Sequence, residues 1–205
     1  MRGYPSIENT RSHDVARSAA ESLGAFLAVC AVGVFAGLIA GHVRLHLGLP
    51  GHKALFVMAP VIAARLVFRS AAGATGGMLA AALASLATGG QIIGLSSHLP
   101  FAAIAGCVLD GTIGLAERWR LGALWAIVLT GIAGAAANLV MLAERLLTPI
   151  FQWHAFLGLS GQGARLLSYA VFGLLAGFMG AGIAAVICRR RHGPHETTSP
   201  SKLKL

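Results

Sequence analysis

The sequence predicts an all-α protein, a polytopic membrane bundle of six transmembrane helices with cytoplasmic N and C termini. The chain has 205 residues, of which 56% are hydrophobic and only 11% charged, whereas a soluble domain carries about 25% charged residues. Its mean hydropathy is +0.75, and its 27 glycines are typical of closely packed membrane helices. We therefore expect a transmembrane domain over 19–188, between a polar cytoplasmic tail (1–18) and a basic cytoplasmic tail (189–205).

The first predicted span covers residues 19–40, which is long enough to cross a hydrocarbon core of about 30 Å. Gly33, Gly37 and Gly41 follow one another at four-residue spacing, so they share one helix face on which another helix can approach closely. This face suits either packing within the chain or docking of a partner subunit, and we mark the three glycines as candidate docking residues.

The second and third predicted spans cover residues 53–68 and 71–87. Both are short, and Pro60 should kink the second because proline removes a backbone hydrogen bond. The stretch that follows, 88–98, is rich in glycine and serine yet apolar, and 91–98 is its C-terminal part. It fits either a loop or a re-entrant segment.

The remaining predicted spans cover 99–116, 121–143 and 166–188. The fourth holds Asp110, an intramembrane carboxylate whose burial is expensive unless it is paired. Arg65, near the end of the second span, lies at the same predicted depth, so we expect an Arg65–Asp110 ion pair; a proton relay is the alternative. The fifth holds Asn138, which suits ligand contact or a hydrogen bond between helices equally well.

Six crossings place both termini on one side, and the basic residues agree with this topology. Most of the sixteen Lys and Arg residues fall at the edges that share a side with the termini, which the positive-inside rule assigns to the cytoplasm. The opposite edges carry only Arg44, Lys53, Arg145 and Arg165.

The same topology gathers polar side chains on the outer face, where the connectors after the first, third and fifth spans meet. A polar mouth over an apolar bundle is suited to capturing a solute. The candidate substrate-binding residues are His42, His46, His52, Gln91, His98, Asn138 and His154.

His42 and His46 are four residues apart and would share a face if the first helix continued that far. Two neutral imidazoles on one face are candidate ligands for a transition metal. The alternative is that both histidines only anchor the helix at the lipid headgroups.

Several functions are excluded by what the sequence lacks. The net charge of +9 follows from the basic cytoplasmic edges, and no aromatic residues alternate with them as in a nucleic-acid surface. There is no P-loop, dinucleotide fingerprint or HExxH motif, and no nucleophile–base pair or complete metal site. We expect neither an enzyme nor a bound cofactor, and no ATP hydrolysis by this chain itself.

Over nearly its whole length the pattern resembles the substrate-binding S components of energy-coupling factor (ECF) transporters. The features that carry the resemblance are the small residues Gly33, Gly37 and Gly41, the long outer connectors, and the stretch LPGHKALFVMAPVIAARL. The resemblance implies a multi-pass protein of a prokaryotic cell (inner) membrane that captures a vitamin or other micronutrient. It also implies partners, namely a membrane coupling protein and ATPase subunits, with the glycine face of the first helix as the docking face.

Two other readings stay open. The outer-face histidines would also suit a stand-alone permease or channel for a transition-metal ion or small solute. A non-transporting scaffold subunit would instead have a stable partner and no ligand.

Overall fold

The computed structural model describes residues 7–42, 51–87, 99–147 and 159–191, and these residues form six helices and no strand. The helices are α1 (Ile7–His42), α2 (Ala54–Phe68), α3 (Gly73–Ala87), α4 (Leu99–Arg118), α5 (Ala123–Leu147) and α7 (Leu159–Arg191). The predicted all-α class is therefore correct for the described part of the chain.

Within the described ranges, four helical segments are long and apolar enough to cross a membrane, namely Arg17–Ala40, Leu99–Arg118, Ala123–Ala143 and Gly163–Arg191. Large apolar side chains are exposed along them, including Phe35, Leu124 and Leu167. Apolar side chains left exposed on this scale suit a lipid environment rather than water. The chain thus has the character of a membrane protein.

The helices α2 and α3 are shorter, with 15 residues each. At 1.5 Å per residue they are about 22 Å long, which is less than the roughly 30 Å of a hydrocarbon core. By length, the described part of the chain therefore contains four spans and two shorter apolar helices.

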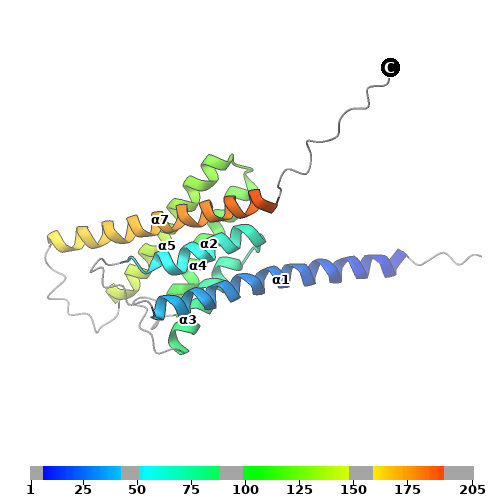
Figure 1. Ribbon diagram of the computed structural model, residues 1–205, viewed down its shortest axis with the longest axis horizontal. Coiled ribbons are helices and arrows are strands. Elements are labelled where there is room, and N and C mark those ends of the chain that lie inside the picture. Colours follow the sequence, from blue (N-terminus) through cyan, green and yellow to red (C-terminus); the bar gives the residue numbers. More distant parts are fainter. Residues whose placement is uncertain (1–6, 43–50, 88–98, 148–158, 192–205) are drawn as a thin grey trace, which may run out of the picture.

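The helix α2 lies at the centre of the bundle, between α1 and α7 (Figure 1). It is buried on almost every side, from Val57 through Arg65 with Pro60 as the partly exposed exception. A helix that is apolar all round is expected in such a position. The helix continues as one element through Pro60.

Several helices are longer than the sequence predicts. The helix α1 begins at Ile7 and α7 begins at Leu159, so part of each predicted polar segment is helical. Once a long span is formed, each further residue adds a hydrogen bond without a new nucleation step. Hydropathy locates the apolar part of a helix and misses such polar extensions.

The glycine face of α1 packs against α3 within the chain. A Cβ atom on Gly33 would overlap the backbone carbonyl of Gly77, and one on Gly37 would lie 2.5 Å from the carbonyl oxygen of Ala81. Of the two uses predicted for this face, the structure contains packing within the chain, because α3 covers Gly33 and Gly37. The surroundings of Gly41 lie outside the described part.

The first residue of α1 and the last residue of α7 lie at the same end of the bundle (Figure 1). The end of α1 and the starts of α2 and α7 lie at the opposite end. We call the first the terminal end and the second the opposite end.

The turn between α4 and α5 contains an arginine in a conformation that glycine normally adopts. Leu121 N donates to Ala116 O and Arg120 N donates to Glu117 O, both at 3.2 Å, and Arg120 has φ 49°. These two bonds and the left-handed residue define a Schellman motif. A Cβ in this conformation costs about 1–2 kcal/mol.

We expect Arg120→Gly to raise the free energy of unfolding by roughly 0.5–1 kcal/mol, because relief of the left-handed strain exceeds the entropy lost by glycine on folding. Thermal unfolding of the purified protein in detergent measures this. A lower melting temperature than that of the wild type would contradict the assignment of strain at Arg120.

Candidate functional site

At the opposite end, His52 is held at the start of α2 by a tight turn. Gly51 has φ 87°, and Ala54 N donates to Gly51 O at 3.1 Å. His52 is only 9% exposed. Its ring meets that of Phe172 edge to face, with centroids 6.3 Å apart. The turn thus directs the imidazole against α7.

Asn138 of α5 reaches the same turn of α7. It is 2% exposed, and its Nδ2 donates to the carbonyl oxygen of Tyr169 at 2.7 Å. A Cβ on Gly173 would lie 2.7 Å from Cβ of Asn138, so glycine is needed there for the helices to approach. Of the two roles predicted for Asn138, the structure contains the hydrogen bond between helices.

Together, His52, Asn138, Tyr169 and Phe172 form what we call the α7 junction. Gly51 also packs here, since a Cβ on it would lie 3.2 Å from Tyr169. The junction brings two of the predicted binding residues, from α2 and α5, onto one turn of α7. Tyr169 and Phe172 are not predicted from the sequence, because aromatic residues in an apolar helix carry no signal that separates a site from packing.

The other predicted binding residues are not brought into this junction by the described structure. His42 is exposed at the end of α1, and its Nδ1 lies 2.8 Å from the carbonyl oxygen of Leu38 in the same helix. His46, Gln91, His98 and His154 lie outside the described residues. The proposed His42–His46 metal pair is therefore not tested. In the described ranges, no three His, Cys, Asp or Glu side chains could hold a metal ion.

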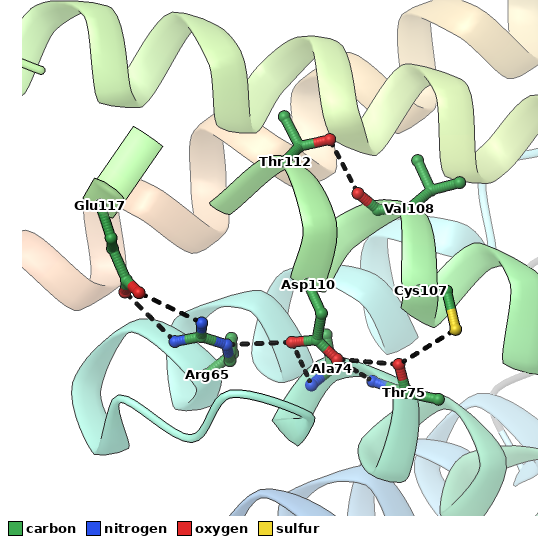
Figure 2. A network of polar contacts seen from close by, with 8 residues as sticks. All are labelled: Arg65, Ala74, Thr75, Cys107, Val108, Asp110, Thr112 and Glu117. Atoms are coloured by element: carbon green, nitrogen blue, oxygen red, sulfur yellow. Dashed lines mark hydrogen bonds and ion pairs between the residues drawn. The ribbon is translucent and has the colours of Figure 1, made fainter. Parts of the chain in front are cut away.

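A polar network near the terminal end contains the ion pair expected from the sequence (Figure 2). Arg65 Nε lies 2.9 Å from Asp110 Oδ1, and the side chains are 2% and 10% exposed. The other two guanidinium nitrogens of Arg65 donate to the two carboxylate oxygens of Glu117 at 3.2 and 3.3 Å. The buried arginine is thus held by two carboxylates from α4.

Asp110 also caps the N-terminus of α3. Its Oδ1 accepts from Ala74 N at 3.1 Å, and its Oδ2 accepts from Thr75 N and Thr75 Oγ1, both at 2.8 Å. The first backbone bond of α3 runs from Gly76 N to Ala72 O, so Ala72 occupies the N-cap position without a side-chain acceptor of its own. Asp110 supplies that acceptor from the neighbouring helix.

Each oxygen of Asp110 accepts two hydrogen bonds, and its negative charge faces the positive end of the α3 dipole. This arrangement supports a structural role rather than the alternative proton relay. The part of Glu117 could have been predicted, because it lies two helical turns after Asp110 on the same face of α4. The capping of α3 could not, because it depends on which helix start faces Asp110.

Comparisons with known proteins add no further information about the site. The chain matches no protein-family model, and neither the curated proteins nor the solved structures contain a match.

Proposed function

We propose that the protein is the membrane-embedded substrate-capture subunit of an uptake system for a vitamin or other micronutrient. It would work with a separate membrane coupling protein and ATPase subunits in a prokaryotic cell membrane. The observation that carries the proposal is the α7 junction. His52 and Asn138 are buried there against one turn of α7, and small-molecule sites combine mostly apolar walls with a few polar groups of this kind.

The arrangement of the helices supports the same proposal. The start of the first helix and the end of the last helix lie on one side of the bundle (Figure 1), which agrees with an even number of crossings. We propose that the short helices α2 and α3 also cross the membrane and complete six crossings. With the basic terminal end in the cytoplasm, the α7 junction would face the outside.

The proposal places the coupling partner on a surface other than the glycine face of α1. Packing of Gly33 and Gly37 against α3 leaves no room there for a second protein. The exposed apolar sides of the four long helices remain for that contact.

The test is gentle purification of the C-terminally tagged chain from its native membrane, followed by mass spectrometry of co-purified proteins and small molecules. We expect two ATPases, a coupling membrane protein and one enriched small molecule. His52→Phe keeps an aromatic ring against Phe172 but removes the imidazole nitrogens. We expect it to reduce the small molecule about tenfold or more without removing the partner proteins.

The matched control is Glu21→Gln, a change at an exposed residue of α1 far from the α7 junction. This variant should retain both the small molecule and the partner proteins. Repeated recovery of the chain alone would contradict the proposal. It would favour the stand-alone permease, for which uptake into proteoliposomes without ATPases is the deciding measurement.

A further inference from the structure

A pocket near the terminal end is lined by arginines that the network around Asp110 does not use. Its volume is about 540 Å³, and it lies between the ends of α2 and α4 and the beginning of α5. Arg69, Arg120 and Glu117 supply its charged groups, while Leu66 and Ile113 are among its apolar walls. We call it the arginine pocket.

The charges of this pocket are unbalanced toward positive. Both carboxylate oxygens of Glu117 are held by Arg65, whereas Arg69 and Arg120 are exposed and form no ion pair within the described residues. Arg65, Asp110 and Glu117 together carry one negative charge, so the two further arginines leave the region with one positive charge. An anion would complete it.

The backbone at both arginines adds a second observation. Arg69 has φ 52° and Arg120 has φ 49°, and they are the only residues other than glycine with positive φ in the described ranges. Glycine would end α2 and α4 at lower cost. The negative ends of the α2 and α4 dipoles already have a positive side chain in their last turns, namely Arg65 and Arg118. The helix dipoles therefore do not explain why arginine rather than glycine follows each helix. Strained positions of this kind gather at binding sites.

The depth of the pocket indicates the kind of anion. Trp119 and Trp125 flank the turn between α4 and α5, and their exposed fractions are 63% and 62%. Exposed tryptophans mark the level of the lipid headgroups. Phosphate is the anion that lipid headgroups carry at this depth of the membrane. Arginine binds phosphate through paired, charge-assisted hydrogen bonds.

We propose that the arginine pocket binds a phosphate group through Arg69 and Arg120, with the apolar part of the ligand against Leu66 and Ile113. The phosphate belongs to an anionic lipid headgroup or to a soluble phosphate compound. The tryptophans at the turn favour the lipid. This inference does not depend on the proposed uptake function, because it concerns a different set of residues.

The experiment compares the full-length wild type with Arg69→Asn/Arg120→Asn. Asparagine tolerates positive φ, so the double variant removes both charges without adding backbone strain. Binding is measured by native mass spectrometry from nanodiscs containing phosphatidylglycerol, with phosphatidylcholine nanodiscs as the reference. A second arm titrates inorganic pyrophosphate onto the protein in detergent. The matched control is Arg118→Gln, an exposed arginine at the same end that does not line the pocket.

We expect the wild type to retain phosphatidylglycerol in preference to phosphatidylcholine. The double variant should retain at least about tenfold less phosphatidylglycerol than the wild type. Arg118→Gln should match the wild type. Loss confined to the lipid arm assigns the phosphate to a headgroup, and loss confined to the pyrophosphate arm assigns it to a soluble compound. Equal binding by the wild type and the double variant in both arms overturns the proposal.

If the double variant does not fold, Arg120→Gly takes its place, since it should be more stable than the wild type while still removing one of the two charges. Arg120→Lys, which keeps the charge, should bind more strongly than Arg120→Gly. Equal binding by these two variants and the wild type would also overturn the proposal.

Discussion

Replacing Asp110 with alanine is expected to lower the free energy of unfolding by about 3–5 kcal/mol, the usual loss when one partner of a buried ion pair is removed. The reason lies in the number of groups that depend on this one carboxylate. Arg65 loses its nearest anion, at 2.9 Å, and the backbone N–H groups of Ala74 and Thr75 lose their acceptors. Thermal unfolding in detergent and the monodisperse fraction by size-exclusion chromatography measure the loss.

The conservative variant Asp110→Asn separates charge from shape. Its amide oxygen can still accept from the start of α3, but its amide nitrogen cannot accept the bonds that Oδ2 receives from Thr75. We therefore expect the free energy of unfolding of Asp110→Asn to lie between that of the wild type and that of Asp110→Ala. A melting temperature of Asp110→Asn equal to that of the wild type would show that the negative charge has no structural role.

Removing Arg65 is expected to lower the melting temperature less than removing Asp110. In Arg65→Met, Asp110 keeps three donors and the positive end of the α3 dipole. In Asp110→Ala, buried Arg65 keeps only Glu117, whose side chain is 50% exposed. The opposite order of melting temperatures would mean that the carboxylate depends mainly on the guanidinium and not on the helix start.

The Arg65–Asp110 pair also shows how far sequence reasoning reaches. An apolar segment predicts a helix, and a charged residue within it predicts a partner at equal depth, so hydropathy alone was enough to propose this pair. Neither hydropathy nor the pairing of charges predicts that the start of α3 also bonds to Asp110. The start of α3 has no charge and no cap of its own, and its need for an acceptor is visible only once α4 lies beside it.

The candidate binding residues divide in the same way. His52 and Asn138 were predicted from depth and polarity, and the fold brings them to one turn of α7. Their neighbours Tyr169 and Phe172 could not be predicted, because which turn of α7 faces them depends on how the helices are rotated. From the sequence, Arg69 and Arg120 are predicted only as cytoplasmic charges, since their left-handed conformation is a property of the turns.

The glycine spacing in α1 is the clearest case of a pattern that predicts a close contact without identifying the partner. Four-residue spacing predicts that another helix backbone comes close, but it does not predict which helix. The structure supplies α3, and the interpretation of the spacing changes with it. In the structure, this candidate docking face is a contact between α1 and α3 within the bundle.

For that reason Gly37→Leu is expected to prevent formation of the bundle, with a loss of at least about 3 kcal/mol, the upper part of the range for overpacked sites. The Cβ atom would lie 2.5 Å from the carbonyl oxygen of Ala81 and 2.9 Å from its Cα. Both are backbone atoms, so no change of rotamer relieves the overlap and α1 must move away from α3. The measurements are the yield of folded protein from membranes and its melting temperature.

The matched control is Gly24→Leu on the same helix, where a Cβ meets nothing within 4 Å. Leucine favours a helix more than glycine by up to about 1 kcal/mol, so this variant should be as stable as the wild type or slightly more stable. The two glycine variants also separate the two interpretations of the α1 face. A docking face predicts that Gly37→Leu folds normally and loses only its partner proteins, whereas packing on α3 predicts that the fold fails first. Normal melting of Gly37→Leu together with loss of the coupling protein would restore the docking role and would place α3 elsewhere in the working protein.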